Sequence, residues 1–152
     1  MDTIQINKVL QKYKFTKNKF CGVLPIDKLP IKKVTRPCSF IINSDKSTLP
    51  GKHWFAIYLP EKGNIEYFDS FGLKPLNKEV YKFFRKNGKY NYNKFQIQSN
   101  TSKSCGKFSA LYIAYRSKGL TFKDFISLFY KDKYFNEELI NLLFKNYIIS
   151  HK

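Results

Sequence analysis

The spacing of apolar residues along the chain predicts amphipathic helices. The predicted segments are residues 6–13, 77–88 and 105–119 and a last stretch that starts near Asn136. Gly88 and Gly119 stand where helix-ending glycines are common. Thr121 and Asp124 carry the pattern of a capping box, which marks the start of a further helix. Helices are therefore expected near both ends of the chain and at two or more places between them.

Shorter apolar runs predict the strands of a sheet. They lie at residues 38–43, 53–59, 65–69 and 94–98. The second and third runs flank the turn sequence PEKGN, so they are expected to form a hairpin. Both faces of the first hairpin strand are apolar, which indicates a central strand that is covered on both sides. Residues 22–37 contain three prolines and are expected to be extended or looping.

These elements predict an α+β fold in which a small, mostly antiparallel β-sheet is flanked by helices. The chain has 152 residues, the size of one domain, and no linker or repeat divides it. We therefore expect residues 1–152 to form a single domain. No apolar run reaches the length of about 18 residues that a membrane-spanning helix needs, and the first residues lack the apolar centre of a signal peptide. We expect a protein that has no membrane partner and stays inside a cell.

The net charge of +17 comes almost entirely from lysines that are spread along the chain. Such a charge favours an anionic partner such as DNA, bound through phosphate contacts. Two basic clusters, Lys32–Lys33 and Arg85–Lys86, would contribute to that surface. The abundance of Lys, Asn, Ile, Tyr and Phe also follows from an A+T-rich coding sequence, and the lysines are then only a solvated surface. The charge leaves both interpretations open.

Three cysteines and two histidines limit the chemistry that the chain can offer. No Cys-x-x-Cys pair occurs and the histidines are far apart, so the spacing of a zinc site is missing and no metal is expected. The odd number of cysteines is simplest to explain in a reducing compartment. We expect Cys21 and Cys38 to be partly buried, and their roles stay open.

Three residues offer the parts of a nucleophilic site. His53 opens one hairpin strand, and the hairpin returns the chain so that Asp69 lies within a residue or two of register with it. Facing residues of such strands have Cβ atoms about 5 Å apart, which suits a carboxylate that orients an imidazole. Cys105 starts a predicted helix, where the positive helix end stabilises a thiolate. Each residue alone also has a structural interpretation, as a core histidine, a turn aspartate or a buried thiol.

The sequence around these residues resembles the adenovirus-type maturation cysteine proteases, the adenain-like family. The similarity lies in GKHWFAIYLPEKGNIEYFDSFGLKP and QSNTSKSCGKFSALYIAYRSKG, and it extends over residues 20–129. The resemblance implies that His53 is the general base, that Asp69 orients it and that Cys105 is the nucleophile. It also implies that Gln98 donates to the oxyanion and that Trp54 contacts the substrate. Without the resemblance, Gln98 would be a polar strand end and Trp54 a core residue.

The chain departs from the family pattern at two points. Ser109 stands where many relatives have a second cysteine, and no cysteine lies between Asp69 and Cys105. The adenovirus enzyme is activated by DNA and by a viral peptide that binds through a disulfide, so a matching disulfide partner is missing here. No cofactor is implied, and activation by DNA or by a peptide stays an open expectation.

The function that the resemblance implies is that of a viral cysteine endopeptidase. The A+T-rich residue usage and the small size suit a virophage or related small DNA virus as its source. The enzyme would cut capsid or other precursor proteins during maturation, and DNA would be a second partner through the basic surface. We expect a monomer that acts in the host cytoplasm or nucleus and inside the virion. Two alternatives stay open. One is a protease specific for SUMO or ubiquitin-like proteins, which shares the fold and the His–Asp–Cys order, and the other is a basic nucleic-acid-binding domain without catalysis.

Overall fold

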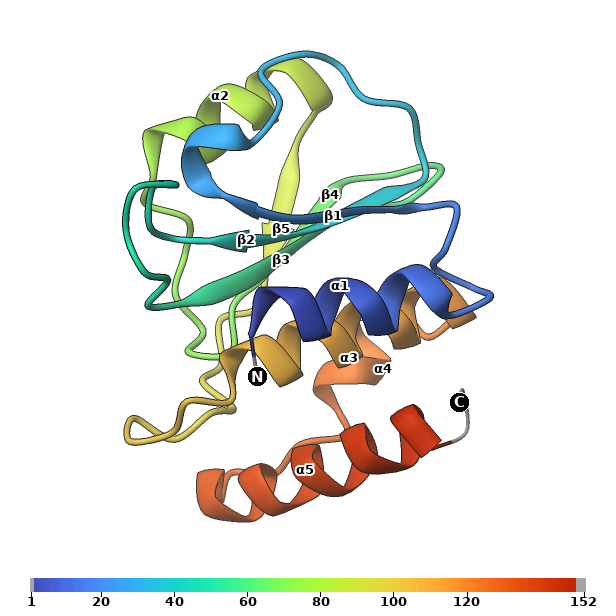
Figure 1. The fold of residues 1–152 in the computed structure, drawn as a ribbon, viewed down its shortest axis with the longest axis vertical. Helices are drawn as coiled ribbons and strands as arrows, with labels where there is room; N and C mark the ends of the chain where they lie inside the picture. The colour runs from blue at the N-terminus through green and yellow to red at the C-terminus, as the bar shows by residue number, and fades with distance from the viewer. Residues whose placement is uncertain (1, 150–152) are drawn as a thin grey trace.

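The computed structural model describes residues 2–149 and shows a sheet between two layers of helices (Figure 1). The elements in chain order are α1 (Thr3–Lys12), β1 (Phe20–Pro25), the 3-10 turn η1 (Ile26–Lys28), β2 (Cys38–Asn43), β3 (Trp54–Leu59), β4 (Ile65–Phe68), α2 (Lys78–Asn87), β5 (Tyr90–Tyr92), α3 (Cys105–Lys118), α4 (Phe122–Ile126) and α5 (Lys133–Ile149). Across the described residues, no helix has both the length and the apolar character to cross a membrane. The α+β class, with helices on both faces of a small sheet, is confirmed.

The five strands lie in the order β1-β2-β3-β4-β5. The central pairs β2–β3 and β3–β4 are antiparallel, whereas the outer pairs β1–β2 and β4–β5 are parallel. The sheet is therefore more mixed than the sequence predicted. The difference arises at its edges, because the sequence analysis recognised neither outer strand.

One local prediction was incomplete and another was wrong. Residues 22–37 were expected to be extended or looping, and residues 26–37 contain no strand, but Phe20–Pro25 forms β1, whose Gly22 sits at φ +126° within a bulge. Residues 94–98 were expected to form a strand, but the edge strand is β5, just before them. Within 94–98, the backbone N–H groups of Ile97 and Gln98 both donate to the Ser70 carbonyl instead of joining a strand ladder. The segment is thus fixed to the turn after β4 rather than to the sheet.

The prediction that both faces of the central strand are apolar and covered is confirmed. Ala56 and Tyr58 pack into the core between the sheet and helices α1 and α3, while Phe55, Ile57 and Leu59 pack into the core under α2. Figure 1 shows α2 and η1 on one side of the sheet, α1 and α3 on the other, and α5 beyond α3. The central strand is buried on both faces, so its start is held rigidly against α3.

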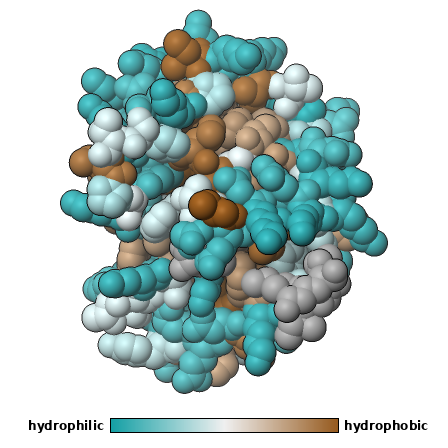
Figure 2. Space-filling view, in the orientation of Figure 1, coloured by the Kyte–Doolittle hydropathy of each residue, from teal (hydrophilic) through white to brown (hydrophobic). Residues whose placement is uncertain are grey.

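Several helix boundaries follow from capping side chains. Asp2 accepts from the Gln5 N–H at the start of α1, and Thr121 with Asp124 forms the predicted capping box at the start of α4. Gly88 ends α2 and Gly119 ends α3, as predicted. The last helix begins at Lys133, three positions before the predicted start. The face of the molecule drawn in Figure 2 is mostly hydrophilic, with scattered apolar residues.

A buried charge cluster joins the sheet to α3. The Arg116 guanidinium donates from Nε to Glu66 Oε2 at 2.7 Å and from Nη2 to Glu66 Oε1 at 2.8 Å. The Tyr112 hydroxyl donates to the same carboxylate, and the guanidinium lies 4.6 Å from the centre of the Tyr58 ring. The Glu66 carboxylate thus accepts three hydrogen bonds from two side chains of α3. This cluster fixes the helix that carries Cys105 to the strand that ends before Asp69.

Arg116→Met is expected to lower the free energy of unfolding by about 3 kcal/mol, because it leaves a buried carboxylate without its charged partner. The measurement is urea denaturation followed by circular dichroism. Arg85→Met, at an exposed position in the last turn of α2, is the control and should change stability by less than about 0.5 kcal/mol. Equal midpoints for the two variants would show that the cluster does not stabilise the fold.

Candidate active site

His53 and Asp69 meet at the ends of β3 and β4. His53 directly precedes β3 rather than lying within it, and Asp69 directly follows β4. The register pairs Ala56 with Phe68, so the two side chains lie at the same end of the hairpin. His53 Nε2 lies 2.9 Å from Asp69 Oδ2, with the carboxylate side chain 3 % exposed. The hairpin therefore provides a buried carboxylate that orients an imidazole.

Asp69 is itself fixed by the turn that it begins. Its Oδ1 accepts from the Phe71 N–H at 2.8 Å, and its carbonyl accepts from the Gly72 N–H at 2.8 Å. The Phe71 ring packs beside the imidazole with 5.2 Å between ring centres. Each carboxylate oxygen of Asp69 thus has a defined partner, which leaves the His53 ring little freedom to turn.

Gly72 completes this turn for a steric reason. It adopts φ +70°, and a Cβ at this position would lie 2.6 Å from the Phe95 carbonyl carbon and 2.7 Å from the Gln96 nitrogen. Both atoms are backbone and cannot move aside. The sequence DSFG therefore needs its glycine so that residues 95–96 can approach the Asp69 turn.

Cys105 is the first residue of α3 and faces the same imidazole. The thiol is buried at 4 % exposure, and α3 is 14 residues long, so its positive end acts on the sulfur. Cys105 is close enough to His53 to help raise the pKa of the imidazole. The other ring nitrogen, Nδ1, is buried and makes no hydrogen bond to nitrogen, oxygen or sulfur within residues 2–149. With Nε2 bound to Asp69, Nδ1 is the ring nitrogen still available to Cys105.

These neighbours change the acidity of His53. Burial alone would lower the pKa of the imidazole, but the hydrogen bond to Asp69, the proximity of Cys105 and the negative charge of both groups outweigh it and raise the pKa to about 9. The imidazolium form is therefore favoured at neutral pH. A positively charged ring beside a sulfur is the arrangement that favours a thiolate.

Ser109 and Trp54 hold the two halves of the site together. The Ser109 hydroxyl, fully buried one turn after Cys105, donates to the Trp54 carbonyl at 3.4 Å. The Trp54 side chain is partly buried and packs against the core on the α3 side. Trp54 thus follows His53 in the chain, and its side chain contributes to the packing of the core. The Ser109 hydrogen bond therefore links the start of β3 to the start of α3.

Gln98 is fully buried, and its amide is fixed at both ends. Its Oε1 accepts from the Ser70 hydroxyl, and its Nε2 donates to the carbonyl and the hydroxyl of Ser102, each at 3.1 Å. Ser70 thereby sets which way the amide faces. The Nε2 protons point into the loop that leads to Cys105, where they are bound to Ser102 in this structure.

Two further residues that the sequence analysis missed support the site. Asn93, which follows β5, donates from Nδ2 to the Asp69 carbonyl and accepts from the Asp69 N–H at 2.9 Å. Ser70 binds Gln98 as described above. The sequence feature that could have pointed to Ser70 is its place in DSFG, between Asp69 and the constrained Gly72. Nothing in the sequence pattern pointed to Asn93, because its partner lies 24 positions away.

The remaining cysteines lie elsewhere on the sheet. Cys38 pairs with Leu59, at the end of β3 opposite His53. Cys38 is buried as a small core residue, but Cys21 is exposed, so the expected partial burial is wrong for both. A hydrogen bond from Cys38 lowers the pKa of Cys21 to about 7. Within residues 2–149, no group of three His, Cys, Asp or Glu side chains is arranged to hold a metal ion.

Comparison with known proteins finds viral cysteine proteases. The chain is 31 % identical over 112 residues to a cysteine protease of African swine fever virus, which covers 63 % of this chain and 41 % of that protein. It is 28 % identical over 154 residues to a protein named as a thiol protease in Acanthamoeba polyphaga mimivirus, covering 84 % of this chain and 51 % of the other. The chain thus spans about half or less of the length of these relatives. No protein-family profile matches it.

Solved structures show the same fold. The crystal structure of the African swine fever virus protease superposes with a TM-score of 0.61 at 21 % identity, over 87 % of this chain and 62 % of the other. The central domain of the Lpg1148 protein of Legionella pneumophila superposes with a TM-score of 0.60 at 16 % identity, over 99 % and 96 %. The chain is therefore related in sequence to viral cysteine proteases and has the fold of one of them.

The acidity of His53 can be measured by an NMR titration of the histidine ring protons. The His53 signal, assigned by its loss in His53→Ala, should titrate near pH 9. Asp69→Asn should move the midpoint down, because a hydrogen bond and a charge that raise the pKa are weakened while the burial that lowers it stays. A wild-type midpoint near the ordinary value of about 6.5, unchanged in Asp69→Asn, would contradict the geometry.

Proposed function

We propose that the chain is a cysteine endopeptidase in which Cys105 attacks the peptide bond and His53 transfers the protons. The observation that carries the proposal is the convergence on one imidazole of Asp69, 2.9 Å from Nε2, and of the helix-start cysteine. Base, orienting carboxylate and thiol are the parts of a cysteine nucleophile system. The sequence similarity to viral cysteine proteases supports the same reaction class.

The first half of the reaction forms an acyl-enzyme. The Cys105 thiolate attacks the carbonyl carbon of the scissile bond and forms a tetrahedral oxyanion. The His53 imidazolium, which its raised pKa keeps protonated at neutral pH, gives its proton to the leaving nitrogen. The C–N bond breaks, the amine departs, and a thioester links the substrate to Cys105.

The second half hydrolyses this thioester. The neutral His53 takes a proton from water as the water oxygen attacks the acyl carbon. The carbon–sulfur bond then breaks, the carboxylic acid product leaves, and the Cys105 thiolate and the His53 imidazolium are restored. Asp69 stabilises the imidazolium and holds its ring in the orientation that both halves need.

The oxyanion would be stabilised by the Cys105 backbone N–H and the Gln98 amide. The first N–H groups of a helix have no partner within the helix and are ready donors. Gln98 Nε2 now binds Ser102, so it must exchange at least one of these bonds for the substrate oxygen. Because Ser70 holds Oε1, Nε2 is the atom of the Gln98 amide that faces the substrate side and can make this exchange.

Two substrate classes follow from different observations. The sequence resemblance to adenovirus-type maturation proteases favours virion precursor proteins cut after small residues. Relatives in African swine fever virus carry the name SUMO-1 cysteine protease, which favours a ubiquitin-like protein as the alternative. The rate of cleavage of a SUMO-1 fusion is compared with that of an unfolded peptide with the same cleaved sequence. The comparison distinguishes the two substrate classes. Cleavage of the peptide at an equal rate supports the precursor substrate, whereas cleavage of the folded fusion alone supports the alternative.

The nucleophile can be identified with a peptide that carries a thiol-reactive vinyl sulfone in place of its last carbonyl and ends in Gly. We expect the wild-type adduct to map to Cys105 by mass spectrometry. His53→Ala should slow labelling by at least about 100-fold, because the base and the charge beside the sulfur are both lost. Equal labelling of wild type and His53→Ala would overturn the mechanism.

The exposed Cys21 needs its own control in this experiment. Its lowered pKa makes it reactive toward any electrophile, with or without a working site. The background is therefore Cys21→Ser, and small iodoacetamide is compared with the peptide reagent. Preference of Cys105 for the peptide reagent supports a substrate-binding site, and an adduct confined to Cys38 would argue against one.

Ser70→Ala tests the orientation of the Gln98 amide. The variant should lower kcat about tenfold with little change in KM, since the affected donor acts on the transition state. Labelling of Cys105 by iodoacetamide, which needs no oxyanion hole, should stay unchanged. Ser39→Ala is a matched control, because Ser39 is equally buried and its hydroxyl has no hydrogen-bond partner within the described residues. Equal kcat in both variants would show that Ser70 does not position Gln98.

A further inference from the structure

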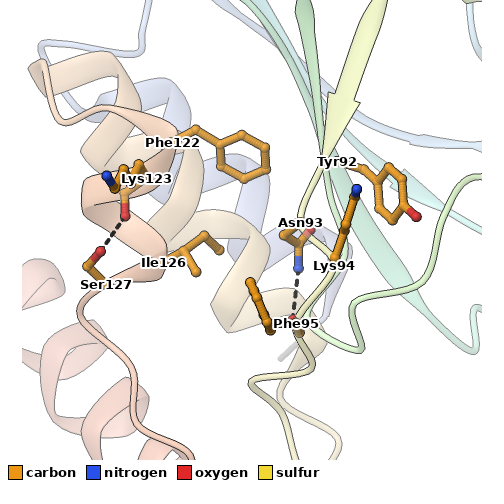
Figure 3. Close-up of a pocket in the computed structure, with 8 residues that line it drawn as sticks. All are labelled: Tyr92, Asn93, Lys94, Phe95, Phe122, Lys123, Ile126 and Ser127. Atoms are coloured by element: carbon orange, nitrogen blue, oxygen red, sulfur yellow. Dashed lines mark hydrogen bonds between the residues drawn. The ribbon is translucent and has the colours of Figure 1, made fainter.

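A groove runs between α4 and the segment that follows β5. It contains two hollows, of about 530 Å³ and 440 Å³, which share Lys94, Phe95 and Ile126. Figure 3 shows the first hollow, with the side chains of Phe122 and Ile126 on the α4 side and residues 92–95 on the other. The groove is therefore a two-part depression with Phe95 at its division.

The groove exposes more apolar surface than folding alone explains. The side chain of Phe95 is 73 % exposed and that of Tyr130, in the second hollow, is 62 % exposed. Adjacent exposed apolar side chains on one depression mark a surface that binds another apolar group. Two hollows indicate two apolar side chains in the partner.

The lysines around the groove favour a partner of negative charge. Lys94 and Lys123 line the first hollow, and Lys94, Lys131 and Lys133 line the second. Neither hollow is lined by an acidic residue: the neighbouring Asp124 and Asp132 accept from backbone N–H groups at the starts of α4 and α5 instead. Charge complementarity therefore favours an acidic segment over a basic or neutral one.

The groove and the candidate active site share the segment formed by residues 93–98. Asn93, which lines the first hollow, binds the Asp69 backbone through its side chain, and Ile97 and Gln98 bind the Ser70 carbonyl. Residues 93–98 form the wall between the two places and span at most about 20 Å. A polypeptide held at Cys105 can therefore continue along this wall into the groove.

We propose that the groove binds an acidic segment of the protein substrate that carries two large apolar side chains and lies apart from the scissile bond. The two side chains occupy the two hollows on either side of Phe95, and the lysines pair with the acidic residues between and beside them. This inference rests on the proposed protease function, since it names a second part of the substrate.

Binding is tested without catalysis, in Cys105→Ser. The probe is a fluorescent peptide of Asp, Glu and Gly with two Phe residues, and its affinity is measured by anisotropy. Matched probes replace both Phe by Ser, or all acidic residues by Lys. The acidic Phe probe should bind most tightly, and Phe95→Ala should weaken it about tenfold, the loss expected for one apolar contact. Leu76→Ala, at a residue 76 % exposed outside the groove, should not change it.

Two results would overturn the binding site. If the acidic Ser probe binds as tightly as the acidic Phe probe, attraction to the net charge of +17 explains all binding. If Phe95→Ala binds like Leu76→Ala, the groove is not the location. Because Cys105→Ser does not turn over substrate, failure here leaves the protease proposal intact.

A cleavage assay tests that the occupant is part of the substrate. Two reporters share one scissile sequence, and one of them also carries the acidic Phe segment on a flexible linker. Wild type should cut the extended reporter with a KM about tenfold lower, and Phe95→Ala should remove the difference. Equal KM values for both reporters, with measurable cleavage, would contradict the assignment of the groove to substrate. If neither reporter is cut, the protease proposal fails while the binding result still stands or falls by anisotropy.

Discussion

The site depends on one constraint: the Asp69 carboxylate must be immobile before it can hold a charged imidazole in one orientation. A buried carboxylate is costly unless its oxygens are satisfied, and here one oxygen accepts from the Phe71 N–H while the other meets His53. Asn93 holds the backbone of the same residue from the neighbouring segment. The charge on His53, and the state of the sulfur beside it, follow from this fixed acceptor.

The surrounding fold explains how this acceptor meets a thiol from a distant part of the chain. The hairpin brings His53 and Asp69 together, while the Glu66–Arg116–Tyr112 cluster and the Ser109 bond to Trp54 fix α3 against the same strands. The helix therefore presents its positive end to the open end of the hairpin. Two solved structures at 21 % and 16 % identity share the overall fold, which shows that this fold tolerates wide changes in sequence.

Much of this arrangement could be predicted because its signals are local. The apolar alternation of β3, the turn PEKGN and the capping box at Thr121 each act within a few residues, and each was read correctly. The outer strands could not be predicted in this way, because β1 and β5 are defined by parallel pairing with distant partners. The same reason hid Asn93, whose partner Asp69 lies 24 positions away. Asp69 and Cys105 were visible because turn and helix starts carry their own sequence signals.

The central claim is that the Cys105 sulfur and the His53 ring share one site, and the most direct measurement is chemical cross-linking. 1,3-Dibromoacetone alkylates a thiol first and then joins it to a nucleophile within reach of its three carbons. In the Cys21→Ser background, mass spectrometry after digestion should find a single cross-linked pair that contains Cys105 and His53. A cross-link from Cys105 to another residue, or only a one-ended adduct on Cys105, would contradict the account.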